Sequence, residues 1–303
     1  MKNKLSLALM MGYLLPGLVL ATDKLEVVTA TSDLADFVKA VGGDKVKVVS
    51  LSNGSQDPHF IEPRPSMVMQ VKKADVLVRI GMDLDLWVQS LIEASRNSKV
   101  MYGGPGYLDA SRKIEKLEVP TGKIDASMGD IHLYGNPHYW LDPENAKPIL
   151  GSIVKKLCEM LPSESEYFNK NYEEYLRILD SAIAKWEEEM KPYAGAKIVT
   201  YHNSWPYFTK RFRLEIIGCV EPKPGIPPTP SHIVSLVKKI KEEKVKVIIM
   251  EPYFNLKVTE KIAKDSGAKV VVLPPSVGGI QGANTYLHLF EYNIGKLAES
   301  LQD

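Results

Sequence analysis

Three histidines stand in short, conformationally restricted contexts that come from separate parts of the chain. These contexts are Asp57-Pro58-His59, Asn136-Pro137-His138 and Tyr201-His202-Asn203. An imidazole nitrogen is a ligand that zinc and other borderline transition metals prefer, and a neighbouring proline restricts the backbone that directs the ring. We therefore predict that His59, His138 and His202 bind one metal ion. The alternative for each histidine taken alone is an ordinary surface or core side chain.

Segments typical of strands and helices alternate in both halves of the chain. In the first half, strands are predicted at 25–31, 46–51 and 76–80, and helices at 33–41, 66–74 and 84–95. In the second half, strands are predicted at 197–201, 214–220, 245–250 and 269–273, and helices at 231–243, 256–266 and 286–301. This alternation is typical of βαβ units. We predict an α/β fold with two lobes, each a mostly parallel sheet with flanking helices.

A long amphipathic segment separates the two halves. Its apolar residues recur at steps of three and four: Phe168, Tyr172, Tyr175, Leu179, Ile183, Trp186 and Met190. That spacing predicts one apolar stripe on a helix, and about 26 residues at roughly 1.5 Å each would reach about 39 Å. We predict a rigid spine helix at 163–192, joining an N-terminal lobe at 22–162 to a C-terminal lobe at 193–303. Two shorter helices are the alternative.

The predicted strands suggest where the three histidines meet. His202 directly follows a predicted strand, and His59 lies in the loop after another. His138 ends an irregular segment at 103–135 and precedes Asp142, a predicted helix cap. Ligands of open α/β sheets collect outside the carboxyl ends of the strands. The sequence therefore predicts a metal site between the lobes.

The beginning of the chain has the pattern of a secretory signal. Lys2 and Lys4 precede an apolar run at 5–20, and small residues end at Ala21. We predict a signal peptide at 1–21, with a retained anchor as the alternative, and no lipid attachment because no cysteine stands at the predicted cut. No later run approaches the roughly 20 apolar residues of a membrane helix, so we expect no stable membrane insertion after signal cleavage.

Composition gives no reason to expect a charged polymer as partner. The chain carries 38 basic and 37 acidic residues, for a formal charge of +1, so neither nucleic acid nor an anionic membrane is indicated. Cys158 and Cys219 are the two cysteines, and export permits them to pair without requiring it. Two isolated thiols do not predict a cysteine metal site.

These features resemble the periplasmic metal-binding receptors of bacterial ABC importers for zinc and manganese, a family in which a long backbone helix joins two lobes. The resemblance rests on Gln56-Asp57-Pro58-His59, on Ala74-Asp75-Val76-Leu77-Val78 with Gly81, on the segment from Asn136 to Pro143, on Tyr201-His202 and on Glu251-Pro252. It implies that His59, His138 and His202 are the first three metal ligands. A histidine in the third place resembles zinc carriers, so zinc is favoured over Mn²⁺ or Fe²⁺.

The same resemblance implies a solute-binding protein and not an enzyme. Its partners would be the membrane permease and ATPase subunits of an ABC importer, and we expect a periplasmic monomer. One alternative is a periplasmic zinc-dependent hydrolase that uses an open three-histidine site. A sugar or siderophore receptor of similar outline is a third possibility.

The fourth ligand is where the sequence departs from the family pattern. Pro274 stands where the family usually has aspartate, and proline cannot bind a metal. Glu251 follows a predicted strand and is a candidate for the fourth ligand or for an acceptor that orients a histidine. His132 is predicted to be an ordinary residue of the irregular segment, with transient metal contact as the alternative. We expect structural roles for His232 and His288.

Overall fold

Two four-stranded parallel sheets form the framework of the protein. The computed structural model describes residues 24–122 and 132–302. The first sheet contains β1 (Leu25–Thr29), β2 (Val46–Ser50), β3 (Val76–Arg79) and β4 (Tyr107–Asp109). The second contains β5 (Lys197–Thr200), β6 (Glu215–Cys219), β7 (Val247–Met250) and β8 (Lys269–Val272). The strand orders β2-β1-β3-β4 and β6-β5-β7-β8 are equivalent, and the predicted two-lobed α/β fold is confirmed.

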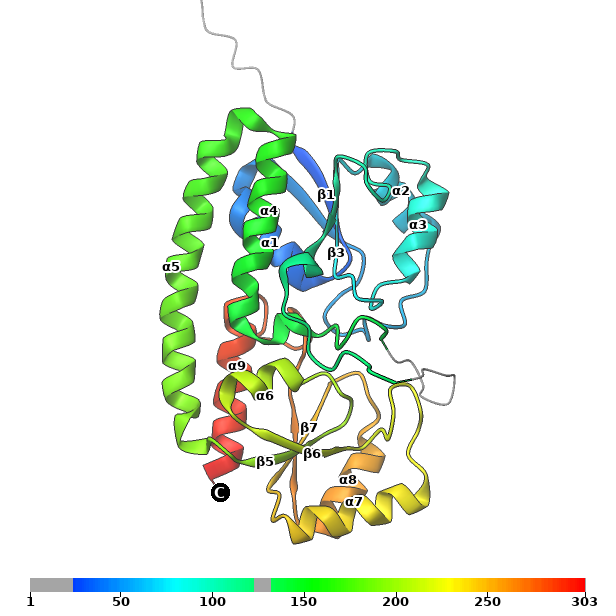
Figure 1. The fold of residues 1–303 in the computed structure, drawn as a ribbon, viewed down its shortest axis with the longest axis vertical. Helices are drawn as coiled ribbons and strands as arrows, with labels where there is room; N and C mark the ends of the chain where they lie inside the picture. The colour runs from blue at the N-terminus through cyan, green and yellow to red at the C-terminus, as the bar shows by residue number, and fades with distance from the viewer. Residues whose placement is uncertain (1–23, 123–131, 303) are drawn as a thin grey trace, which may run out of the picture.

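Helices flank both sheets, as Figure 1 shows. The first lobe has α1 (Ser32–Gly42), α2 (Pro65–Lys73), α3 (Trp87–Ser95) and α4 (Ala146–Met160). The second has α6 (Pro206–Phe212), α7 (Pro230–Glu242), α8 (Leu256–Ser266) and α9 (Tyr286–Gln302). Strands β3 and β7 are buried along their whole length. Their apolar runs, Val76–Val78 and Val247–Met250, follow from helices covering both faces of a parallel sheet.

One long helix, α5 (Ser165–Met190), runs beside both lobes (Figure 1). It packs against α1 and α4 of the first lobe and against α9 near its other end. Its buried face includes Phe168, Leu179, Ile183, Trp186 and Met190. The predicted spine is therefore a single 26-residue helix and not two shorter ones.

Several elements differ from the sequence prediction. The segment predicted as irregular contains β4, a short strand at the edge of the first sheet. Helix α6 was not predicted because its seven residues are too few to show a periodicity. Helix α3 begins at Trp87 and not at 84, because Met82 and Asp83 have positive φ angles of 50° and 64° that belong to a turn.

Direct hydrogen bonds join the two lobes beside the spine. At the start of α1, the hydroxyl of Ser32 donates to the carbonyl of Val277 (2.7 Å), and the amide of Val277 donates to Asp33 (2.9 Å). The indole of Trp140 donates to the carbonyl of Pro275 (2.7 Å). Burial raises the pKa of Asp33 to about 7. These buried bonds restrain the lobes at the same edge at which the histidines meet.

Two other sequence expectations concern the ends and the thiols of the chain. The predicted signal at 1–21 lies outside the described residues. In the part of the chain that the structure describes, no helix has both the length and the apolar character needed to cross a membrane. Cys158 and Cys219 are both free thiols.

Candidate metal centre

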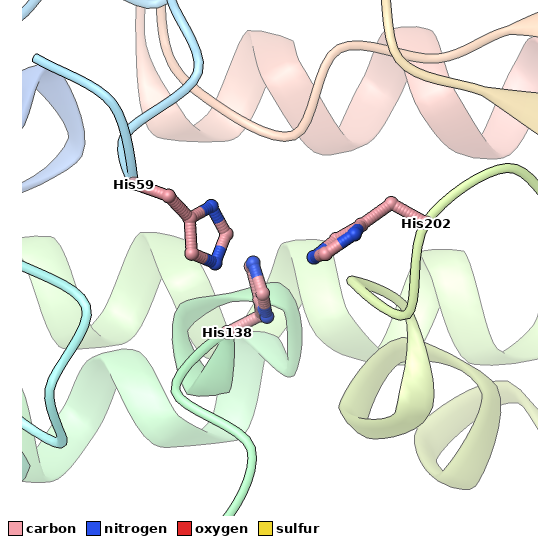
Figure 2. A group of neighbouring side chains, drawn as sticks. All are labelled: His59, His138 and His202. Atoms are coloured by element: carbon pink, nitrogen blue, oxygen red, sulfur yellow. The ribbon is translucent and has the colours of Figure 1, made fainter. Parts of the chain in front are cut away.

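The three predicted histidines point toward one another from three different loops (Figure 2). One ligand nitrogen from each of His59, His138 and His202 lies within 4.8 Å of the others. The ring centroids of His59 lie 5.1 Å from those of His138 and His202, which are 5.5 Å from each other. His138 and His202 are buried and His59 is half-buried. The structure thus brings together residues that are more than 60 positions apart in the sequence.

The first two histidines are held by the same local motif. Oδ1 of Asp57 accepts from the backbone amide of His59 (3.0 Å) and from its ring Nδ1 (2.7 Å). Oδ1 of Asn136 lies 3.0 Å from the amide of His138 and 3.0 Å from its Nδ1. In each case the acceptor stands two residues before the histidine, across a proline. Because Nδ1–H is donated to this acceptor, the lone pair of Nε2 is left for a metal ion.

His202 uses an acceptor from a neighbouring strand. Its Nδ1 lies 2.7 Å from Oε2 of Glu221, which follows the end of β6. The amide of Glu221 donates to the carbonyl of Tyr201 (2.9 Å), so the acid and the histidine are held at one edge of the sheet. Sequence reasoning missed Glu221. The sequence places this acidic residue directly after the strand predicted at 214–220, at the carboxyl end where ligand-binding loops meet, and that position could have identified it.

The buried Nε2 of His138 has no hydrogen-bond partner among the described residues. A buried polar atom without a partner is costly, by about 1–3 kcal/mol, and such atoms are uncommon in native proteins. An imidazole nitrogen that faces two other imidazoles and lacks a partner fits a metal ligand. The donor set of this site is therefore suited to a divalent transition metal.

Glu251, which the sequence suggested as a fourth ligand, lies against the chain that follows His202. It is fully buried, and its Oε1 accepts from the hydroxyl of Ser204 (2.7 Å) and the indole of Trp205 (3.0 Å). Burial raises its pKa to about 7, although the charge of His202 opposes the shift. Its observed contacts fasten the chain between His202 and α6. Within the described residues, Glu251 does not belong to the group of converging ligand atoms.

The remaining histidines have different surroundings. His132 faces the cluster, with its Nε2 3.2 Å from Nε2 of His59, and its predicted role, ordinary or in metal contact, stays a prediction. Burial and the neighbouring His59 lower the pKa of His132 to about 3. His232 lies 2.9 Å from the carbonyl of Cys219, and His288 is exposed on α9.

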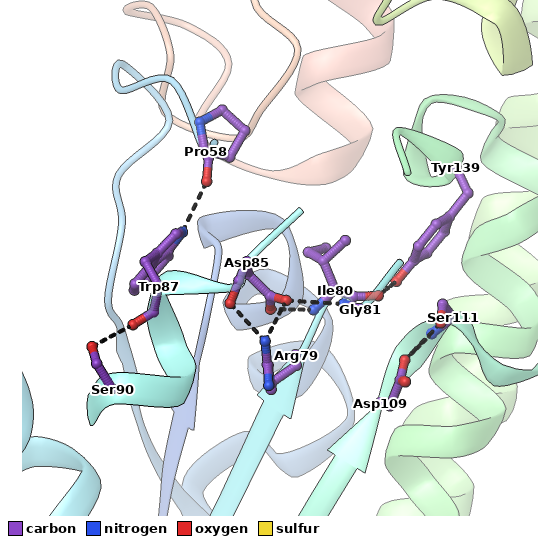
Figure 3. Close-up of polar contacts among 10 residues, drawn as sticks. All are labelled: Pro58, Arg79, Ile80, Gly81, Asp85, Trp87, Ser90, Asp109, Ser111 and Tyr139. Atoms are coloured by element: carbon purple, nitrogen blue, oxygen red, sulfur yellow. Dashed lines mark hydrogen bonds and ion pairs between the residues drawn. The ribbon is translucent and has the colours of Figure 1, made fainter. Parts of the chain in front are cut away.

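A buried polar network at the carboxyl end of β3 supports two of the metal-site loops (Figure 3). The guanidinium of Arg79 donates to the carboxylate of Asp85 (3.1 Å) and to its backbone carbonyl (2.6 Å). The same carboxylate accepts from the amides of Ile80 (2.9 Å) and Gly81 (3.2 Å). Arg79 and Asp85 are 8% and 1% exposed, so this pair is largely removed from water. It fixes the sharp turn that follows the strand.

Both sides of this turn contact the histidine loops. The indole of Trp87 donates to the carbonyl of Pro58 (2.9 Å), next to His59. The hydroxyl of Tyr139 donates to the carbonyl of Ile80 (2.7 Å), next to His138. One strand end therefore positions two of the three converging rings.

Comparison with known proteins identifies the family. Residues 27–300 match the family described as the periplasmic component A of the zinc-uptake complex. The chain belongs to this family. The resemblance inferred from the sequence motifs is thereby confirmed.

The family description names zinc, whereas a relative is named for manganese. The manganese ABC transporter substrate-binding lipoprotein PsaA of Streptococcus pneumoniae is 29% identical over 295 residues, covering 93% of this chain and 90% of PsaA. The metal ABC transporter substrate-binding lipoprotein SloC of Streptococcus mutans is 27% identical and covers 99% of both chains. A crystal structure of ZnuA shares the fold, with a TM-score of 0.77 and 24% identity over 92% of this chain and 99% of that chain. A mutant of the laminin-binding adhesin Lmb from Streptococcus agalactiae has a TM-score of 0.78 and 26% identity, covering 91% of this chain and 99% of Lmb.

These relationships establish the general function of this family member. It is a metal-binding substrate-binding component of an ABC transporter and not an enzyme. The hydrolase and the sugar or siderophore receptor are therefore set aside as alternatives. Membership implies permease and ATPase subunits as partners.

Metal affinity should fall as the pH drops below neutrality. Burial lowers the pKa of His202, but the hydrogen bond to Glu221 and the charge of Glu251 outweigh this and raise it above 6.5. Burial keeps the pKa of His138 well below 6.5. Since a protonated imidazole cannot bind a metal, Kd should rise by at least about one log unit per pH unit below the pKa of His202. Competition titrations with zinc from pH 8 to 5.5 measure this.

Substitution of Glu221 tests the cause of this pH dependence. Glu221→Gln removes the charge that raises the pKa of His202, so the onset of weaker binding should move to lower pH. The comparison uses the pH at which zinc binding begins to weaken and not the absolute Kd. The absolute Kd is unsuitable because losing the acceptor that orients a metal-binding histidine itself reduces metal affinity by about 10- to 100-fold. Equal Kd values at pH 8 and pH 5.5 in the unaltered protein would contradict the prediction.

Proposed function

We propose that this protein captures zinc in the periplasm through His59, His138 and His202 and delivers it to an ABC importer. The observation that carries this proposal is the convergence of three imidazoles, each with an oxygen acceptor at Nδ1. This arrangement directs the three Nε2 atoms toward one another. A preformed set of nitrogen donors favours tight binding of the ion, because little ordering is needed when it binds.

The choice of zinc rests on the chemistry of these donors. Imidazole suits zinc, whereas manganese is better served by carboxylate and other hard oxygen ligands. The nearby carboxylates of Asp57 and Glu221 bond the outer nitrogens of the histidines and orient them. Manganese in the names of several relatives makes Mn²⁺ the competing cargo, and Fe²⁺ is a third.

The proposed location rests on the predicted signal peptide at 1–21. The relatives PsaA and SloC are named as lipoproteins, and no cysteine stands at the predicted cut in this chain. We propose an exported protein without a lipid anchor. Cell fractionation with intact-mass measurement tests this, and a lipid adduct or a retained N-terminus would overturn it.

The first test of the proposed cargo is competition between metals in vitro. The mature protein is equilibrated with equimolar zinc, manganese and ferrous iron, dialysed and analysed for bound metal, and crystals are examined by anomalous scattering at each absorption edge. We expect one zinc ion at the three histidines. Zinc at 100 times its Kd should also stabilise the fold by about 2.7 kcal/mol. Bound manganese in preference to zinc would reject zinc as cargo, and no bound metal would reject the site.

Because a nitrogen-rich site prefers zinc to manganese in any competition, the physiological cargo needs a cellular test. A strain that lacks the protein should grow poorly under zinc limitation and normally under manganese limitation. Growth that fails under manganese limitation alone would assign the transporter to manganese.

A further inference from the structure

A fourth histidine, His132, faces the three converging rings. Its Nε2 lies 3.2 Å from Nε2 of His59, and the two ring centroids are 5.2 Å apart. Its ring centroid lies 6.4 Å from that of His138. His132, His138 and His202 also line one small cavity of about 60 Å³. Because Asp57 bonds Nδ1 of His59, the nitrogen that His132 approaches is the one left for the metal.

The distance between His132 and His59 matches two ligands of one zinc ion. With Zn–N bonds of about 2.0–2.1 Å and tetrahedral angles, two ligand nitrogens are separated by about 3.3 Å. Without metal, one neutral imidazole can donate Nε2–H to the other across the same 3.2 Å. The proton then stands between the two nitrogens that a metal ion would share. Metal binding needs this proton to leave Nε2 of His132 and the ring to carry its proton on Nδ1 instead.

The carboxylates near the site have other partners. Asp57 and Glu221 each bond the outer nitrogen of a histidine, and Glu251 accepts two hydrogen bonds from the chain that leads into α6. Glu118 lines the same cavity as His132, and its Oε2 accepts from the side-chain amides of Asn136 (3.0 Å) and Asn203 (2.8 Å). Pro274 stands where the family resemblance implies a carboxylate. Among the described residues, the ligand atoms that lie within 4.8 Å of one another belong to His59, His138 and His202, and His132 adjoins this group through His59. We propose that His132 is the fourth protein ligand, that it moves toward the other two rings when the metal binds, and that it completes a tetrahedral site made of imidazoles alone. This inference rests on the proposed function, in which zinc is the cargo.

An all-imidazole site has a consequence for selectivity. Four neutral ligands leave the full charge of the cation uncompensated by direct ligands, which suits a borderline metal and disfavours a hard one. A carboxylate at position 132 would supply the harder oxygen ligand. His132 is thus assigned a role in discriminating zinc from manganese, as well as in binding.

Four proteins test this ligand: the unaltered chain and the variants His132→Ala, His132→Asp and His288→Ala. The last removes an exposed histidine on α9 and serves as the matched control. Zinc and manganese Kd values are measured by competition, and the Co²⁺-substituted proteins are examined by visible absorption and by X-ray absorption, which counts imidazole ligands. The first readout reports affinity, and the second reports the coordination sphere directly.

We expect His132→Ala to weaken zinc binding about 10- to 100-fold, because water takes the open position, and to lose one imidazole from the Co²⁺ sphere. His132→Asp should retain most zinc affinity and improve manganese binding relative to zinc. His288→Ala should match the unaltered protein.

An unchanged Co²⁺ spectrum and imidazole count in His132→Ala would overturn the assignment of His132, whatever the change in Kd. His138→Ala is measured beside these four proteins, and if it abolishes zinc binding, the proposed function survives the failure of the His132 assignment. Absence of metal binding by the unaltered protein would reject both. If His132→Ala does not fold, the His132→Asp variant decides, because a ligand exchange must change the Co²⁺ spectrum and a surface change must not.

Discussion

Replacing His138 with alanine should remove high-affinity zinc binding while leaving the metal-free fold largely intact. Nε2 of His138 has no hydrogen-bond partner among the described residues, so its loss breaks no bond of the metal-free protein at that atom. Its acceptor, Asn136, keeps hydrogen bonds from its amide group to Glu118 (3.0 Å) and to the carbonyl of Asn203 (2.8 Å). The lost interaction is therefore mainly the metal bond.

We expect His138→Ala to weaken zinc binding by more than about 100-fold. This loss exceeds the 10- to 100-fold loss that is typical when a residue that orients a metal ligand is replaced. At a zinc concentration that stabilises the unaltered protein by about 2.7 kcal/mol, a variant with 100-fold weaker binding gains only about 0.4 kcal/mol. Thermal unfolding with and without zinc measures the difference. His288→Ala should keep the full shift, and a full shift in His138→Ala would remove His138 from the site.

Replacing Arg79 with methionine should destabilise the first lobe severely. The change keeps an apolar stem of similar length but leaves the carboxylate of Asp85 buried without its cation. Burial already raises the pKa of Asp85, and Arg79 is the main group that opposes this. Removing one partner of a buried ion pair typically costs about 3–5 kcal/mol. Urea unfolding at pH 8, where an isolated carboxylate is charged, measures this cost.

Metal binding should weaken in the same variant even where it remains folded. The turn that Asp85 organises contacts the loops of His59 and His138 through Trp87 and Tyr139, so zinc affinity should fall by about 10- to 100-fold.

Two further variants separate the ion pair from other effects of the substitution. Arg79→Met with Asp85→Asn removes both charges and keeps an acceptor for the amides of the turn, so it should be less destabilised than Arg79→Met alone. Arg177→Met is the surface control, because Arg177 pairs with Glu174 on the exposed side of α5 and surface pairs contribute little. Equal stability losses in Arg79→Met and Arg177→Met would contradict a structural role for the buried pair.

Much of the fold was predictable because its signals are local. Patterns that repeat every two residues, or every three to four, reflect which side of a strand or helix is buried. The spine and the strands other than β4 were therefore located within a few residues. The beginning of α3 was misplaced because the turn before it depends on the buried contacts of Asp85 with Arg79 and with two backbone amides. The spacing of apolar residues in the sequence does not reveal such polar contacts.

The candidate site was predictable in part for the same reason. The acceptors of His59 and His138 stand two residues before them, within the same turn of chain. The acceptor of His202 is Glu221, which is brought close by the pairing of β5 with β6. No spacing rule connects these two positions, because the register of neighbouring parallel strands is set by the packed sheet and not by the intervening chain.

By itself, the sequence determined the chemistry of the donors, the class of fold and the edge of the sheets where the histidines would meet. These follow from residue type, from periodicity and from the rule that loops at the carboxyl ends of parallel strands converge. Only the tertiary structure decided that the rings lie within ligand distance, that Glu251 lies behind the His202 loop and that His132 reaches His59. The physical reason is that a ligand site requires distances correct to a fraction of an ångström, and these are set by packing between segments distant in sequence.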